Sequence, residues 1–141
     1  MIQRIQSLWL LLAATCAVFT FRLSFFSGNR MGENNMPVFE KLVASSSFVI
    51  MIFTALLIGG CLVLIFLYKN RKQQLWLTVA ALGVSVINII LYFRETKTFV
   101  PGQGNYDLTS VIAFSIPVWL VLALRGIWSD EKLVKSLDRL R

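Results

Sequence analysis

Residues 44–68 read ASSSFVIMIFTALLIGGCLVLIFLY, and this stretch decides the fold class. It runs for 25 residues without a charged side chain. A spanning helix needs about 20 mostly apolar residues, because each residue adds about 1.5 Å and the hydrocarbon core is about 30 Å thick. The stretch is therefore predicted to be a transmembrane helix.

Three further stretches of the 141-residue chain meet the same length requirement, namely residues 7–26, 75–93 and 110–128. A content of 57% apolar and 15% charged residues is atypical of a soluble domain. We predict an all-α membrane protein in which residues 1–128 form one domain, an antiparallel bundle of four transmembrane helices. Its first partner is then the lipid bilayer.

Basic residues near helix ends predict the orientation, because positively charged flanks are retained in the cytoplasm. Nine of the 14 Lys and Arg residues lie on the side of both termini and the 69–74 turn, and the other five lie on the opposite side. We therefore predict that both termini are cytoplasmic and that loops 27–43 and 94–109 are external. The net charge of +7 is then a topology signal facing anionic lipid and does not indicate nucleic acid.

The outer loops are rich in Gly, Asn and Pro, which are turn formers. Residues 96–100 are β-prone and precede a Pro-Gly-Gln-Gly turn, which favours a short local hairpin. A two-stranded hairpin is only marginally stable alone. The hairpin is therefore expected to be a minor feature of a helical protein.

Small residues at helical spacing predict the inner face of each helix, because helices in lipid associate through close packing. The predicted faces comprise Ala13, Ala17, Thr20 and Ser24, then Ser47, Thr54 and Cys61, and finally Thr78, Ala81, Ser85 and Asn88. Spacings of seven residues predict near-antiparallel helix crossings.

Asn88 is the one amide side chain deep in a predicted span. By residue count it lies at the depth of Ser115, and Pro117 leaves the carbonyl of Ala113 without its helical hydrogen bond. We expect Asn88 to bond this carbonyl or Ser115 and, with Ser85, to hold helices together. A polar lining for a small substrate is the alternative, but the four spans contain no Asp, Glu or His.

The chain contains no histidine, which excludes bis-His haem and His-based zinc or general-base chemistry. Cys16 and Cys61 reach similar depths but form no C-x-x-C pair, and we expect both to be unpaired packing residues. No catalytic, cofactor-binding or metal-binding residue is assigned. No cofactor, metal or nucleic acid is expected as a partner.

Residues 129–141 are predicted to form a short amphipathic cytoplasmic helix capped by Ser129. A leucine-rich stripe surrounded by charges suits either the inner leaflet or a protein partner. The residues predicted to form a cytoplasmic docking surface are Arg4, Glu131, Lys132, Asp138 and Arg139.

The two ends of the chain carry a family resemblance. Residues 1–13, MIQRIQSLWLLLA, and residues 122–141, LALRGIWSDEKLVKSLDRLR, resemble a family of uncharacterised four-helix inner-membrane proteins of Bacteroidota, a domain of unknown function. The resemblance implies a bacterial inner membrane location and supplies no activity. It also directs attention to polar residues that the topology brings to one membrane side, including Gln6 and Asp130.

These features favour a non-enzymatic accessory subunit or assembly factor that binds other integral membrane proteins. A small transporter or channel protomer is the alternative, disfavoured by the lack of charge within the spans. A membrane enzyme acting on lipid or quinone is the third hypothesis, disfavoured by the lack of His and of paired carboxylates.

Overall fold

A computed structural model describes residues 2–31, 36–67 and 70–138, with side chains described for 5–31, 36–67 and 70–132. Four helices and three strands make up these parts. In chain order they are α1 (Ile2–Phe19), β1 (Phe26–Met31), β2 (Pro37–Leu42), α2 (Phe48–Phe66), α3 (Arg71–Thr96), β3 (Phe99–Tyr106) and α4 (Ser110–Asp138).

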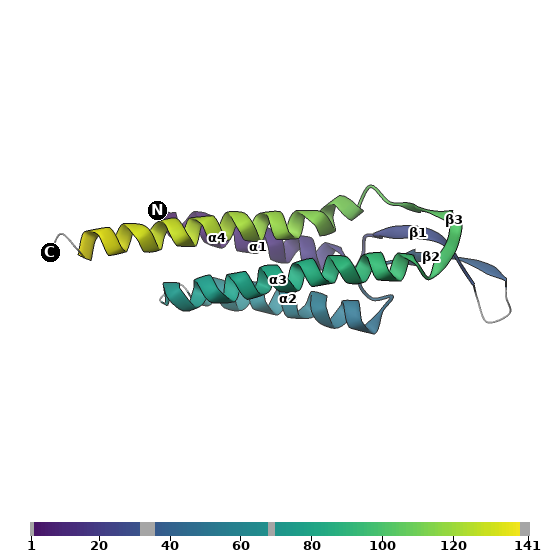
Figure 1. Cartoon of the computed structure of the whole chain (residues 1–141), viewed down its shortest axis with the longest axis horizontal. Coiled ribbons are helices and arrows are strands. Elements are labelled where there is room, and N and C mark those ends of the chain that lie inside the picture. The colour runs from purple at the N-terminus through teal and green to yellow at the C-terminus, as the bar shows by residue number, and fades with distance from the viewer. Residues whose placement is uncertain (1, 32–35, 68–69, 139–141) are drawn as a thin grey trace.

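The helices run side by side, and the strands lie together beyond one end of them (Figure 1). α1 packs against α2 and α4, and α3 packs against the same two helices. Both ends of the chain lie at the end opposite to the strands (Figure 1). The chain therefore has a strand-bearing end and a terminal end, and polar clusters occur at each.

The first helix is shorter than its predicted span. It ends at Phe19 because the following residues turn and join the sheet: the amide of Ala44 donates to the carbonyl of Thr20 at 2.9 Å, and the amide of Phe25 donates to Leu42 at 2.7 Å. Its 18 residues reach about 27 Å. Residues 20–26 thus form the connection into the sheet and do not lengthen the helix.

The last helix is longer than expected. α4 continues without a break from Ser110 through Asp138, a run of 29 residues. The prediction of a separate helix beginning at Ser129 is therefore wrong, because the chain from there onward extends the fourth helix. Pro117 lies inside the same helix.

The protein is mostly helical, as predicted, but it is not all-α, because the three strands form one antiparallel sheet in the order β2-β1-β3. The short local hairpin expected at residues 96–100 and the following turn does not form, because α3 continues to Thr96 and β3 runs through the Pro-Gly-Gln-Gly stretch and pairs with β1. β1 pairs with β2 as well, from Phe26 opposite Leu42 to Met31 opposite Pro37. The two outer loops therefore supply each other's strand partners.

Glycine is required where β1 meets β3. A Cβ atom at Gly28 would lie 2.7 Å from the Cα of Gly104 and 3.0 Å from the carbonyl oxygen of Gln103. Both are backbone atoms, so no side-chain rotation could relieve the contact.

Aromatic side chains attach the sheet to the helices. Phe25 stacks on Tyr92 of α3, with ring centroids 4.7 Å apart. Phe26 packs edge-on against Phe99 and Tyr106 of β3. Leu42 and Ile50 complete this buried cluster between sheet and helices.

The helices bury small and polar residues beside leucine and isoleucine, and they also expose many large apolar side chains, which a soluble protein keeps mostly inside. The buried positions include the predicted small and polar residues Ala13, Ala17, Thr20, Thr54, Cys61, Thr78, Ala81, Ser85 and Asn88. Large apolar side chains instead cover the outside: Phe66 is 78% exposed and Phe48 is 71% exposed. This pattern is typical of helices that face lipid.

Three helical stretches in the described parts of the chain are long and apolar enough to cross a membrane, namely Phe48–Phe66, Arg71–Thr96 and Ser110–Lys132. The first predicted span corresponds to a shorter apolar helix, Ile5–Phe19 in its described side chains. These helices indicate a membrane protein.

Candidate functional site

The terminal end contains a polar cluster that joins three helices. The side-chain amide of Gln6 on α1 donates to the carboxylate of Asp130 on α4, and both residues are buried. The guanidinium of Arg71, at the start of α3, donates to the backbone carbonyl of Asp130 at 3.3 Å. Gln6 thus forms a direct polar link between the first helix and the last at this end.

Gly126 gives Gln6 the room to reach across α4. A Cβ atom at this position would lie 2.9 Å from the Cγ atom of Gln6. The helix surface is therefore open where the glutamine crosses it, one turn before Asp130.

A second glutamine closes the end of α2. The side-chain amide of Gln74 on α3 donates to the carbonyl of Leu64 at 3.0 Å and is buried. The last four carbonyls of a helix lack hydrogen-bond donors within the helix. The Gln74 amide supplies a donor to one of these carbonyls, that of Leu64. It also fixes the first turn of α3 beside the last turn of α2.

The predicted docking residues are only partly described. Lys132 is exposed and Glu131 is half-buried and engaged in an interaction. The side chains of Arg4 and Asp138 lie outside the described side chains, and Arg139 lies outside the described residues. The predicted docking surface did not include Asp130 or Gln6, although Asp130 continues the buried stripe Leu120, Ala123 and Ile127 at helical spacing.

A buried polar layer joins α1, α2 and α3 nearer the sheet. The amide of Asn88 donates to the hydroxyl oxygen of Thr54 at 3.1 Å, and that hydroxyl donates to the carbonyl of Ile50 at 2.8 Å. The hydroxyl of Tyr92, one turn after Asn88, faces Thr20 and Thr54. In the described part of the chain, the side-chain oxygen of Asn88 is buried without a hydrogen-bond donor.

The structure gives Asn88 and Ser115 different partners from those expected. Asn88 bonds across to α2 and not to Ser115 on α4. Ser115 donates to the carbonyl of Ile112 at 2.7 Å, and its oxygen lies 3.5 Å from the sulfur of Cys16. Ser85 similarly donates to the carbonyl of Leu82. Serine hydroxyls commonly bond a carbonyl one turn back, which removes the need for an amide partner.

Asp107 connects the sheet to the start of α4. Its carboxylate accepts hydrogen bonds from Ser24 and, at 2.8 Å, from Ser27. Its backbone amide donates to the carbonyl of Phe25 at 3.2 Å. Each carboxylate oxygen thus accepts one hydrogen bond, and together they tie the start of β1 to the residues that precede α4.

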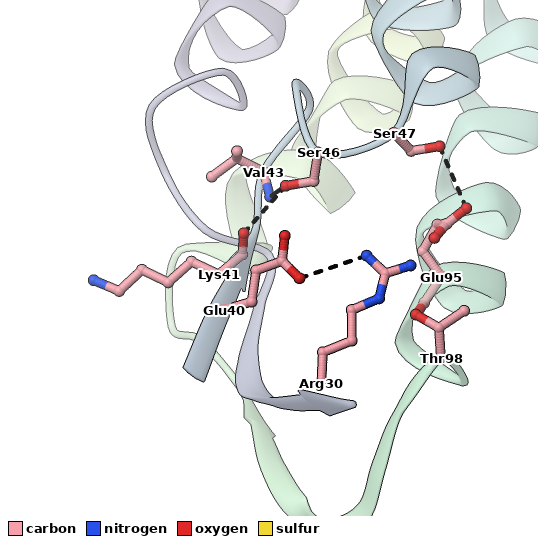
Figure 2. Close-up of polar contacts among 8 residues, drawn as sticks. All are labelled: Arg30, Glu40, Lys41, Val43, Ser46, Ser47, Glu95 and Thr98. Atoms are coloured by element: carbon pink, nitrogen blue, oxygen red, sulfur yellow. Dashed lines mark hydrogen bonds and ion pairs between the residues drawn. The ribbon is translucent and has the colours of Figure 1, made fainter. Parts of the chain in front are cut away.

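Charged side chains at the strand-bearing end form a second set of contacts (Figure 2). Arg30 on β1 pairs with Glu40 on β2 at 3.5 Å, and its guanidinium lies 6.0 Å from the centre of the Phe99 ring. Ser47 donates to Glu95 of α3 at 3.3 Å. Half-exposed ion pairs of this kind contribute about 0–1 kcal/mol, so the cluster orients the sheet more than it stabilises it.

The chain belongs to the family described as a domain of unknown function (DUF4293), whose family model matches residues 2–140. The match covers nearly the whole chain and confirms the predicted membership of an uncharacterised family, a domain of unknown function. No curated protein and no solved structure matched the chain.

Proposed function

We propose that this member of the DUF4293 family is a non-enzymatic accessory subunit or assembly factor of a membrane protein complex in the bacterial inner membrane. All four helices cross the bilayer in this proposal. The 18 residues of α1 reach about 27 Å, which is close to the hydrocarbon thickness of about 30 Å. The exposed large apolar side chains of all four helices then face lipid or partner helices.

The orientation follows from charge and from the shared position of the chain ends. Both termini lie at the end opposite to the sheet (Figure 1), and nine of the 14 basic residues belong to that side. The proposal therefore places both termini in the cytoplasm and the sheet outside.

Topology reporters test this placement. A reporter that works only in the cytoplasm should be active when it is fused after Arg141, because the basic flanks are retained on that side. A reporter that works only outside the cytoplasm should be active when it is inserted at residues 102–105. An external carboxyl terminus would refute the orientation and the cytoplasmic docking surface with it.

The observation that carries the docking proposal is the length of α4. Its 29 residues reach about 43 Å, which exceeds the hydrocarbon thickness of about 30 Å by about 13 Å. In Figure 1 its carboxyl end extends past the ends of the other helices. A rigid helix leaving the membrane presents its charges in a constant order.

A constant order of charges suits recognition of a protein. The final 17 residues of the chain contain five basic and three acidic residues. Charge complementarity at an interface favours one partner and one register, whereas lipid attraction depends mainly on the number of basic residues. The mixed signs therefore favour a protein partner over a purely lipid-bound tail.

Exchanging neighbouring charges tests the docking surface. The variant combines Glu131→Lys with Lys132→Glu, and Asp138→Arg with Arg139→Asp, so net charge and composition stay the same. We expect it to insert at wild-type abundance and to lose the proteins that co-purify with the wild type after gentle extraction. Wild-type co-purification from the exchanged variant would reduce this end of α4 to a lipid anchor.

A small transporter or channel protomer is a second candidate, favoured by the buried polar layer around Asn88. The side-chain oxygen of Asn88 could accept a hydrogen bond from a polar substrate. We prefer the accessory-subunit proposal because the side-chain amide of Asn88 and the hydroxyl of Thr54 both donate to acceptors within the protein. Such bonds hold helices together without any substrate.

A further inference from the structure

β2 is an edge strand of the sheet. The strand order is β2-β1-β3, so β1 pairs with one side of β2, and no other strand of the described chain pairs with its second side. An edge strand presents its outward amides and carbonyls to the surroundings, where they can pair with another chain. The hydrogen bonds around β2 show which of its residues are open in this way.

The main chains of Pro37, Phe39 and Lys41 face away from β1. The carbonyl of Leu42 accepts a hydrogen bond at 2.7 Å from the amide of Phe25, which directly precedes β1. Successive residues of a strand direct their main-chain groups to opposite sides, so Lys41 and every second residue before it face outward. Proline fits position 37 because its missing amide is not needed for pairing with β1.

Ser46 closes one end of this outward edge. Its hydroxyl accepts from the amide of Val43 at 3.1 Å and donates to the carbonyl of Lys41 at 3.1 Å (Figure 2). Within the described parts of the chain, no hydrogen bond from outside the sheet reaches the main chain of Phe39. The groups open to a partner are therefore the amides of Phe39 and Lys41 and the carbonyls of Pro37 and Phe39.

The side chains on the solvent face of this edge are apolar and basic. Side chains alternate across a strand, so Phe39 and Lys41 share one face of the sheet, and the buried Leu42 lies on the other. Phe39 is 63% exposed. Lys41 is exposed, and its side chain extends away from the ion pair of Arg30 and Glu40 (Figure 2). An added strand with an apolar residue beside Phe39 and an acidic residue beside Lys41 would complement both.

A protein segment is the occupant that matches these groups, because an extended backbone supplies both the donors and the acceptors that the edge requires. The hairpin of β1 and β2 extends away from the helices (Figure 1). Phe39 lies three residues beyond Leu42, which is about 10 Å along a strand. In the proposed membrane placement this position is outside the hydrocarbon core, so lipid does not cover it.

A second copy of the chain in the same bilayer fits this edge poorly. Pairing of one edge with itself about a two-fold axis brings the two strands together antiparallel. Two copies with the same membrane orientation point their hairpins in the same direction, so their β2 strands are parallel. A different protein is free of this constraint.

We propose that the outward edge of β2, at residues 37–41, binds an extended segment of a partner protein as a fourth strand, with an apolar residue beside Phe39 and an acidic residue beside Lys41. The proposal names the chemistry of a partner for the proposed accessory subunit and rests on its membrane placement. It is separate from docking by α4, so either interaction can fail while the other stands.

The experiment measures the binding of a fluorescent peptide to the purified full chain in detergent by fluorescence anisotropy. The probe is Thr-Val-Thr-Val-Thr-Glu-Thr, which has valine and glutamate two positions apart on one face. The wild type should bind this probe, and a peptide with lysine in place of glutamate should bind about fivefold more weakly. N-methylation of the valines and glutamate, or of the threonines, removes alternate amides. One of these two peptides should lose binding and the other keep it, because alternate amides of a strand point to opposite edges.

Two substitutions at Phe39 form a matched pair. Phe39→Pro removes the outward amide, whereas Phe39→Val keeps it, and neither change removes a hydrogen bond to β1. Phe39→Pro should weaken probe binding at least about tenfold, and Phe39→Val should stay within about threefold of the wild type. Lys41→Glu should reverse the preference between the glutamate and lysine peptides. The variant with exchanged charges on α4 should bind the probe like the wild type.

Four results would overturn the proposal. Equal binding by Phe39→Pro and Phe39→Val, or equal effects of the two N-methylated peptides, would show that the probe is not held as a strand. An unchanged peptide preference in Lys41→Glu would remove the acidic residue from the partner. A wild type that binds no probe at about 1 mM would reject the site. A wild-type dimer that Phe39→Pro dissociates would assign the edge to a second copy of the chain.

Discussion

Gly28→Val should destabilise the protein by about 3 kcal/mol and detach β3 from β1. The Cβ atom would lie 2.7 Å from the Cα of Gly104, and forcing extra atoms into a packed site typically costs about 1–3 kcal/mol. The upper end of this range applies because the opposing atoms are backbone, which can retreat only by breaking strand pairing. Denaturant unfolding of the purified protein in detergent, followed by circular dichroism, measures the change.

Met31→Val is the matched control for this substitution. Met31 lies on the same strand and is 62% exposed, so valine there should change the free energy of unfolding by less than about 0.5 kcal/mol. Equal stability of Gly28→Val and Met31→Val would contradict the close pairing of β1 with β3.

Gln6→Leu should destabilise the terminal end by about 2 kcal/mol. It removes the side-chain donor to the carboxylate of Asp130, which is 6% exposed. A buried polar group left without its partner typically costs about 1–3 kcal/mol, and more when it is charged. The same unfolding measurement applies, with the exposed glutamine variant Gln73→Leu as the control.

A double variant separates the lost hydrogen bond from a general disturbance of packing. Replacing both partners by apolar groups can be nearly neutral, because no polar group then stays unpaired. Gln6→Leu with Asp130→Leu should therefore be more stable than Gln6→Leu alone. If the double variant instead shows the summed loss of the two single variants, the two residues do not interact.

The sequence by itself located the four helices, although not the ends of the first and the last, and it identified most of the residues on their inner faces. Small residues at Ala13, Ala17, Thr54 and Ala81 were predicted to face inward, and all four are buried. This prediction succeeds because helical spacing is a local property, and because lipid leaves close packing of small residues as a main source of helix association. The family was also evident from the two ends of the chain, and the match over residues 2–140 confirms it.

Only the tertiary structure decided where the polar residues find their partners. Asn88 has Thr54 within hydrogen-bond distance, and Asp130 has Gln6, which is 124 positions away in the chain. The sheet was not predicted for the same reason, because β1 and β3 stabilise each other although they are far apart in the sequence. Without β1 as a partner, the turn formers around Gly102 indicate only a local hairpin. Spacing along one helix or loop specifies which face a residue occupies, but the choice of partner depends on which elements the whole fold brings together.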